Sequence, residues 1–323
     1  MTAAGWTSWR VRHLQEMAGT VGRQPAEPPV VSMGSTGPPH VENPVFLRDK
    51  LVCDGAQVTR PSIDPYREPV ETYVYLCGGR IRLSMPVVIK LGDETPVEYR
   101  RAVVKAAYCM NVLVYVGHYG APEMCMYGDA LLADASSAVS GCCAACTASP
   151  AASLKLDKPV IVKTTPSEEY RWLGRCVEEG CSGVYLDADA GGDADLEVGV
   201  SVLDSELRRL GARNKVSVIA GGGLVRGSDD IYKLVALGAD AAVVSKAVEY
   251  GVGVPEARVG EDVMRERVEN LLLGIQRELK LLAGAAGVSS LFNTLVGNRE
   301  LLRAVEVDRE TRLKLGVKQA GVG

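Results

Sequence analysis

The chain has 323 residues, of which 47% are hydrophobic and 24% are charged, and its formal net charge is -4. This composition suits a globular protein with a substantial core, and the slightly acidic balance argues against a nucleic-acid-binding surface. No segment predicts a transmembrane helix, and the first residues lack the layout of a signal peptide. We therefore expect a cytoplasmic protein with no nucleic-acid or membrane partner. Asn and Gln are scarce, which hints at a thermophilic source.

The first 80 residues predict an extended arm. A short amphipathic helix is indicated around Trp6 to Met17, and residues 22–44 are dense in Pro and Gly, which favours an extended chain. The run from Asp64 to Thr72 is typical of a polar turn before a hairpin. We interpret residues 1–80 as an N-terminal arm that wraps the following domain.

Residues 81–250 alternate between strand and helix patterns, which predicts a parallel α/β fold. Between residues 117 and 158 no convincing helix is found, so one or two crossovers are truncated or the sheet is incomplete. Strands are predicted at 85–90, 112–116, within 128–137, and at 158–163, 183–187, 215–220 and 241–245, with helices at 97–108, 195–210 and 228–237.

The clearest chemical signal is the glycine run that ends the strand beginning at Lys215. Gly221, Gly222 and Gly223 lack Cβ atoms, so their backbone N–H groups can approach an anion closely. Ser228 or Asp229 can cap the next helix. A tight strand-to-helix turn without any ligand is the alternative.

Two regions of the chain resemble a known family. Gly222-Gly223, Arg226-Gly227-Ser228-Asp229 and Leu237-Gly238-Ala239-Asp240 resemble the seventh and eighth strands of FMN-dependent (β/α)₈ barrels. Asp64-Pro-Tyr-Arg-Glu68 resembles the segment before the barrel in archaeal-type glutamate synthases. The resemblance implies a TIM-like (β/α)₈ barrel at 81–250, a helical extension at 251–323, and FMN as cofactor.

The resemblance also implies roles for individual residues. Lys163 corresponds to the strand lysine at the flavin ring, and a surface lysine is the alternative. His118 replaces a family glutamate and is a candidate acid or base, although a solitary loop histidine is more often a surface residue. The cofactor-binding candidates are Gly191, Gly192, Gly221, Gly222, Gly223, Arg226, Ser245 and Lys246.

The chain departs from the family in several places. Asp193 and Ala194 replace the Thr and Gly of a Gly-Gly-Thr-Gly turn, and the acidic run from Asp187 to Asp195 reads as a solvated loop or as a hard-cation site. Lys246 stands where the family has a small residue, so it could add a charge to the phosphate site or block it. Cys142, Cys143 and Cys146 lack the partners of a zinc site, which favours buried thiols or a local disulfide.

The three cysteines that hold an iron–sulfur cluster in glutamate synthases have no counterpart after residue 245, so we predict that no such cluster is bound.

Two functions stay open. The first is an FMN-dependent oxidoreductase that acts on a small carbonyl or imine acid, and the second is a degenerate, non-catalytic barrel that serves as a binding or assembly subunit. The apolar stripe of the predicted C-terminal helix, residues 262–282, could pack on the barrel, on a second copy or on an electron-donor subunit.

Overall fold

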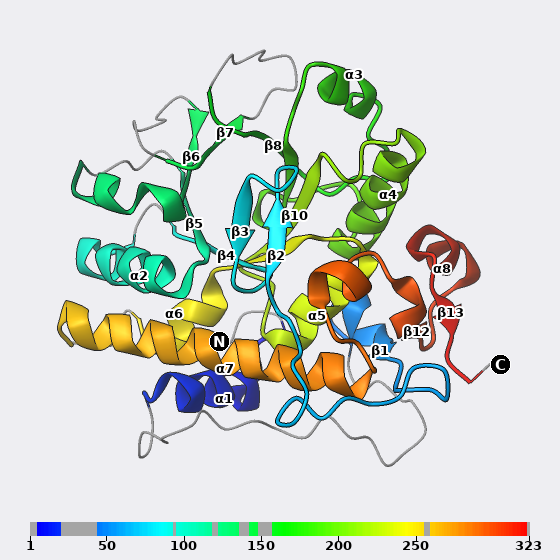
Figure 1. The fold of residues 1–323 in the computed structure, drawn as a ribbon, viewed down its shortest axis with the longest axis horizontal. Coiled ribbons are helices and arrows are strands. Elements are labelled where there is room, and N and C mark those ends of the chain that lie inside the picture. Colours follow the sequence, from blue (N-terminus) through cyan, green and yellow to red (C-terminus); the bar gives the residue numbers. More distant parts are fainter. Residues whose placement is uncertain are drawn as a thin grey trace.

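A closed barrel of eight parallel strands forms the centre of the molecule (Figure 1). The computed structural model describes residues 5–20, 44–92, 95–117, 122–135, 142–147, 157–254 and 259–321. The last strand pairs with the first, Val243 beside Val88, and this pairing closes the barrel. In chain order the strands are β4 (Val87–Lys90), β5 (Leu113–Gly117), β6 (Leu131–Asp134), β7 (Ala144–Thr147), β8 (Val160–Thr164), β9 (Gly183–Asp187), β10 (Ser217–Gly222) and β11 (Ala241–Val244).

Helices cover the outside of the barrel unevenly. They are α2 (Val97–Met110), α3 (Leu173–Glu178), α4 (Leu196–Arg209), α5 (Ser228–Leu237) and α6 (Lys246–Val252). Among the described residues, the connection from β5 to β6 contains the 3₁₀ segment η2 (Pro122–Ala130), and no α-helix lies between β6 and β7. The predicted TIM-like fold is therefore confirmed, with a complete barrel and shortened crossovers in its middle.

Two apolar cores follow from the alternation of side chains along each strand. Val88, Ile161 and Ile219 point into the barrel, where they pack with one another. Their neighbours Val87 and Val218 point outward into a second core beneath the helices. Every second residue of a strand thus faces the barrel axis. The same alternation determines which side chains lie at the carboxyl end of the barrel.

A hairpin closes the amino end of the barrel. Strands β2 (Val74–Leu76) and β3 (Ile81–Leu83) pair antiparallel and cross the middle of the view in Figure 1. The buried side chains of this hairpin belong to the inner core, and the Cys77 N–H donates to Ser217 Oγ at 2.7 Å. The hairpin that the sequence predicted is therefore a plug of the barrel.

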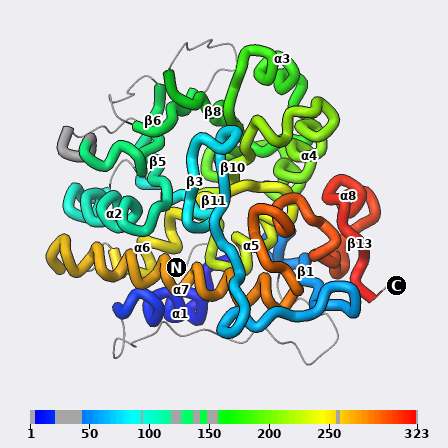
Figure 2. Tube along the Cα trace, in the orientation of Figure 1, coloured from blue at the N-terminus to red at the C-terminus, as the bar shows by residue number. Residues whose placement is uncertain are grey.

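The N-terminal and C-terminal segments meet on the barrel's outside. Helix α7 (Glu261–Ala285) packs against α2, α5, α6 and α1 (Ser8–Ala18), and its course is continuous in Figure 2. Strand β1 (Leu51–Cys53) pairs with β12 (Leu302–Ala304), which pairs with β13 (Lys318–Gln319). The division at residues 80 and 250 stays an interpretation, because β1 and β12 share one sheet. The other segments are η1 (Leu47–Lys50), η4 (Ala188–Ala190), the π-helix η5 (Leu291–Leu295), η6 (Arg299–Leu301) and α8 (Arg309–Leu315).

Two local predictions differ from the structure. Strand β7 was not predicted, because Ala144–Thr147 is short and consists of small residues. Helix α5 is not capped by Ser228 or Asp229, since Gly227 precedes its first turn and Ser228 Oγ donates instead to Glu278 at 2.6 Å. None of the helices in the described ranges has the length and apolar character that crossing a bilayer requires.

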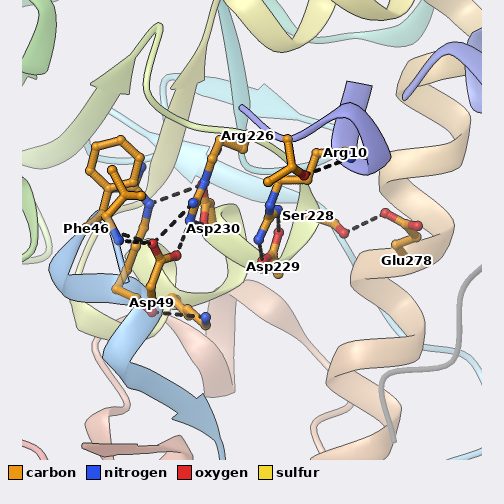
Figure 3. Close-up of polar contacts among 12 residues, drawn as sticks. Arg10, Phe46, Asp49, Arg226, Ser228, Asp229, Asp230 and Glu278 are labelled. Carbon is orange, nitrogen blue, oxygen red and sulfur yellow. Dashed lines mark hydrogen bonds and ion pairs between the residues drawn. The ribbon is translucent and has the colours of Figure 1, made fainter. Parts of the chain in front are cut away.

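A buried cluster of charges ties the arm to the barrel. Asp230 is fully buried on α5 and accepts from Arg226 Nε at 2.8 Å, and Arg48 Nε of the arm lies 3.1 Å from the same carboxylate. Arg48 also donates to Glu197 at 2.6 Å, and Arg226 donates to Asp49 (Figure 3). Burial alone would raise the pKa of Asp230, but the Arg48 charge and the Arg226 hydrogen bond hold that pKa well below its usual range.

Replacing Asp230 with Asn should destabilise the protein strongly, because it removes the buried carboxylate that the guanidinium groups of Arg48 and Arg226 share. We expect a loss of about 3–5 kcal/mol in the free energy of unfolding. Urea denaturation followed by circular dichroism measures this loss. The control variant Glu206→Gln breaks a surface pair with Arg209 and should leave the midpoint nearly unchanged. Equal midpoints for the two variants would contradict the proposed importance of the cluster.

Candidate functional site

Charged and phenolic side chains occupy the last inward-facing position of several strands. In each strand this position lies two residues beyond an inner-core residue, so the side chain reaches the carboxyl end of the barrel. The residues at these positions are Lys90, Tyr115, Asp134, Lys163 and Asp187. Active sites of TIM barrels are built at this end.

Asp187 lies between two lysines. Its carboxylate is 3% exposed, with Lys90 Nζ at 2.8 Å and Lys163 Nζ at 3.0 Å. Burial alone would raise the pKa of Asp187, but the hydrogen bond and charge of Lys90, joined by those of Lys163, hold that pKa below its usual value. Asp187 therefore holds the side chains of both lysines at the carboxyl end of the barrel.

Tyr115 and Asp134 hold Lys163 from the other side. Lys163 Nζ donates to the Tyr115 hydroxyl at 3.1 Å, and that hydroxyl donates to Asp134 Oδ1 at 2.6 Å. The ammonium also lies 5.0 Å from the centre of the Tyr115 ring, a cation–π distance. Burial and the bond to Asp134 raise the pKa of Tyr115, so the phenol stays protonated. Lys163 is thus an oriented cation and not a lysine that extends freely into solvent.

The three glycines at the carboxyl end of β10, Gly221 to Gly223, are needed for different physical reasons. A Cβ on Gly221 would lie 2.4 Å from the Val243 carbonyl oxygen, so Gly221 is required for close packing against β11. A Cβ on Gly222 would lie 2.6 Å from Asp189 Oδ1, and Gly222 has a φ of +154°, which favours glycine. Gly223 uses its backbone N–H, which donates to Asp189 Oδ1 at 2.8 Å. The turn therefore does bind an oxyanion, and that oxyanion is a carboxylate of the same chain.

Asp189 bridges the glycine turn and the lysine cluster. Its second oxygen accepts from Lys90 Nζ at 2.8 Å. Burial would lower the pKa of Lys90, but the hydrogen bonds to Asp187 and Asp189 outweigh burial and raise that pKa. The turn and the lysines thus form one continuous polar surface at the carboxyl end of the barrel.

Ser245 and Lys246 lie beside this surface. Ser245 is buried between β11 and α6, and its carbonyl accepts from the Val248 and Glu249 N–H groups. The stem of Lys246 lies against Gly223, since a Cβ there would be 3.2 Å from Lys246 Cγ. The ammonium of Lys246 pairs with Glu249 at 2.6 Å. Lys246 therefore lies against the turn, and Ser245 follows Val244, which pairs with Gly222.

Arg226 was predicted to contact a phosphate, but its guanidinium is bound by two carboxylates of the chain. Its guanidinium is 4% exposed and binds Asp230 and Asp49, with the Phe46 ring 4.9 Å away (Figure 3). Burial would lower the pKa of Arg226, but these carboxylates raise it above its ordinary value. The structure therefore gives Arg226 a role in joining the arm to α5, and a phosphate contact would have to compete with two carboxylates.

Gly191 and Gly192 belong to the loop that carries Asp189. Gly191 has a φ of +83°, and a Cβ on Gly192 would lie 2.4 Å from the Pro166 carbonyl oxygen. These glycines therefore shape the loop and pack it on the chain after β8. His118, the predicted acid or base, lies outside the described residues.

The solvated-loop interpretation of the acidic run is wrong for Asp187, which is buried between lysines. Lys90, Asp187 and Asp189 were not named as site residues. A signal for Lys90 was present, because it ends its strand as Lys163 does. The pairing of Asp189 with the glycine turn has no sequence signal, since 34 residues separate Asp189 from Gly223.

The cysteines form no disulfide within the described ranges. Cys142 and Cys146 are buried, and Cys143 Sγ donates to the Leu131 carbonyl at 3.1 Å. Burial raises the pKa of Cys143 to about 12, so the thiol stays protonated. Among the residues with described positions, no group of three or more His, Cys, Asp or Glu is arranged to hold a metal ion.

A cavity of about 630 Å³ lies at the opposite end of the barrel, where Gly78, Arg213 and Asp240 line it. Arg213 is already held by Asp240 at 2.9 Å and by Asp204 at 2.7 Å. Residues at the amino ends of barrel strands usually serve stability. We therefore place the candidate site at the carboxyl end, where the lysines and the glycine turn meet.

The chain is similar in sequence to several known proteins. Residues 153–297 match the family model of FMN-dependent dehydrogenases. Archaeal glutamate synthase (NADPH) from Methanocaldococcus jannaschii is 35% identical over 147 residues, which are 39% of this chain and 28% of that protein. Archaeal-type glutamate synthase (NADPH) from Thermotoga maritima is 23% identical over 440 aligned positions, covering 98% of this chain and 84% of that protein.

Solved structures of mandelate oxidase share the fold. One has a TM-score of 0.59 and 17% identity, covering 81% of this chain and 89% of that chain. The predicted resemblance is confirmed: residues 153–297 are similar to FMN-dependent dehydrogenases, the sequence is similar to archaeal-type glutamate synthases, and the fold is similar to that of mandelate oxidase.

Replacing Asp187 with Asn should destabilise the protein at neutral pH, because two ammonium groups lose their shared carboxylate. We expect a loss of about 3 kcal/mol in the free energy of unfolding at pH 7. The folded pKa of Asp187 lies below its unfolded value, so its stabilising effect is present above about pH 4 and is lost as the pH falls through the folded pKa.

Urea denaturation of both proteins at pH 7 and at pH 3 checks this pH dependence. The difference in unfolding free energy should shrink at pH 3. Asp193→Asn, which changes an exposed carboxylate of the same loop, is the control and should match wild type at both pH values. A difference between wild type and Asp187→Asn that does not depend on pH would contradict the charged pairing.

Proposed function

We propose that this barrel, related to archaeal-type glutamate synthases, is an FMN-dependent oxidoreductase that acts on a small carbonyl or imine acid. One observation carries the proposal: the backbone turn after β10 binds an oxyanion next to two lysines at the carboxyl end of the barrel. The family match and the relatives support the cofactor class.

The glycine turn fits the phosphate group. The Gly223 N–H donates to a carboxylate oxygen, and a phosphate oxygen accepts the same kind of hydrogen bond. We assign phosphate binding to Gly222, Gly223 and the backbone around Ser245 and Lys246. The Lys246 stem already packs on Gly223, so its ammonium can turn from Glu249 toward a phosphate.

The lysines supply positive charge at the barrel mouth. When bound, FMN would supply hydride transfer, and a nearby cation stabilises the negative charge that reduction places on the ring. Lys163 is suited to this role because Asp187 and Tyr115 fix its ammonium. Lys90 is the second candidate cation, and its bonds to Asp187 and Asp189 hold its ammonium at the same end of the barrel.

A proton donor is needed when a carbonyl or imine is reduced. Tyr115 holds a proton between Lys163 and Asp134, and burial raises the pKa of its hydroxyl. His118 follows the end of the same strand in the sequence and remains our candidate acid or base. The electron donor would be a small molecule or a separate subunit.

A non-catalytic barrel is the second candidate function. One observation favours it: the Asp189 carboxylate occupies the turn, and Asp187 neutralises the charges of Lys90 and Lys163. In that case the barrel would serve as a binding or assembly subunit, and flavin would not bind.

Titration with FMN, followed by the quenching of flavin fluorescence, distinguishes the two functions. We expect saturable binding to wild type and at least about tenfold weaker binding to Gly223→Val, equal to about 1.4 kcal/mol. The Val side chain would fill the space above the turn, since even a Cβ would lie 3.3 Å from Asp189 Oδ1.

Gly174→Ala is the matched control, because no heavy atom lies within 4 Å of the added methyl group. It should bind FMN as wild type does. Lys163→Met should keep the phosphate contact and bind FMN more weakly than wild type. Equal FMN affinities of Gly223→Val and wild type would contradict the proposed phosphate position. Absence of saturable wild-type binding at millimolar FMN, a free energy weaker than about -4 kcal/mol, would favour the non-catalytic barrel.

A further inference from the structure

The glycine turn carries its own anion. We propose that Asp189 is a displaceable internal ligand that occupies the phosphate position of the turn and thereby sets the affinity and selectivity of the site for phosphate-bearing ligands. This inference rests on the proposed function, because it concerns the phosphate of the same cofactor. It assigns to Asp189 a specificity-determining role that the proposed function does not require.

The contacts of Asp189 match those of a bound phosphate. Oδ1 accepts from the Gly223 N–H at 2.8 Å, and Oδ2 accepts from Lys90 Nζ at 2.8 Å. A Cβ placed on Gly222 would lie within 2.6–2.7 Å of three atoms of the carboxylate group. The carboxylate therefore fills the space that the missing Cβ leaves open. A phosphate cannot occupy this position while Asp189 remains there.

The two acidic residues of the loop differ in how firmly they are held. Asp187 is 3% exposed and binds Lys90 and Lys163, whereas the Asp189 side chain is 34% exposed. Asp189 lies on η4, a segment of only three residues. Gly191 follows with a φ of +83°, and nothing lies within 4 Å of the position where its Cβ would be. Asp189 can therefore leave the turn while Asp187 stays in place.

Lys90 makes this exchange feasible. It is bound to both Asp187 and Asp189, so it keeps a carboxylate partner after Asp189 leaves. The Gly223 N–H exchanges one oxyanion for another, and the number of charge-assisted hydrogen bonds at the turn is conserved. Binding a phosphate then costs the movement of the exposed Asp189 side chain away from Lys90.

Selectivity follows from this competition. A ligand with a phosphate dianion replaces the carboxylate with a stronger acceptor, whereas a ligand that lacks phosphate cannot displace it. Removing the carboxylate should therefore strengthen the binding of phosphate-bearing ligands and leave that of riboflavin, the flavin without a phosphate, unchanged.

The test compares wild type with Asp189→Ala and Asp189→Asn. The probes are FMN, riboflavin and inorganic phosphate, with binding measured by flavin fluorescence and by isothermal titration calorimetry. Asp193→Asn is the matched control, since Asp193 lies on the same loop and accepts from Ser167 Oγ at 3.3 Å, away from the turn. Circular dichroism establishes that each variant is folded. If Asp189→Ala fails to fold, the isosteric Asp189→Asn tests the same direction.

We expect Asp189→Ala to bind FMN and inorganic phosphate at least about tenfold more tightly than wild type, a difference of about 1.4 kcal/mol. Riboflavin affinity should be unchanged, and Asp193→Asn should behave as wild type with all three probes. Unchanged FMN and phosphate affinities in both Asp189 variants would overturn the inference, even if FMN binds well. A gain in phosphate affinity without any flavin binding would support the inference and contradict the proposed function.

Discussion

In a closed eight-stranded barrel, every second side chain of each strand must point toward the axis, and the candidate site depends on this constraint. The inner core is apolar through its middle layers, with residues such as Val88 and Ile161. Two residues later the same alternation places Lys90 and Lys163 at the mouth. Two ammonium groups so close together need a counter-charge, and Asp187 on β9 supplies it at 2.8 and 3.0 Å.

The same constraint limits what the glycine turn can do. Gly221 continues the inward-facing row of β10 and is required for close packing against Val243 of β11. Only the next two glycines are available for an anion, and the Asp189 carboxylate occupies that position in the structure. In this glycine run, Gly221 is therefore required for packing, whereas Gly222 and Gly223 can bind an anion.

The sequence predicted the fold well because its evidence is local. Strand and helix periods, together with the Gly222–Gly223 and Leu237–Asp240 motifs, placed the strands at 85–90, 158–163, 183–187 and 241–245 close to their observed bounds. Strand β7 was missed because four small residues, Ala144 to Thr147, carry little periodic signal. The truncation between residues 117 and 158 was predicted because that segment shows no convincing helix pattern.

The site was predicted less completely, because its interactions join residues that are far apart in the chain. Lys163 could be named from its strand, but its partners Asp187 and Tyr115 follow from the barrel register. Arg226 was expected at the phosphate, and its pairing with Asp49 of the arm depends on a segment packing that no motif encodes. The sequence therefore did not predict the charge pairs between residues that are far apart in the chain, and only the three-dimensional structure shows them.

The central claim is that the turn at Gly222 and Gly223 is an anion site that holds Asp189 until a phosphate replaces it. A crystal structure of the protein grown with FMN tests it most directly. The account predicts phosphate density within hydrogen-bond distance of the Gly223 nitrogen, about 2.7–3.2 Å, with the Asp189 carboxylate moved away and Asp187 still between Lys90 and Lys163. Flavin bound with its phosphate elsewhere, and Asp189 still on the Gly223 N–H, would contradict it.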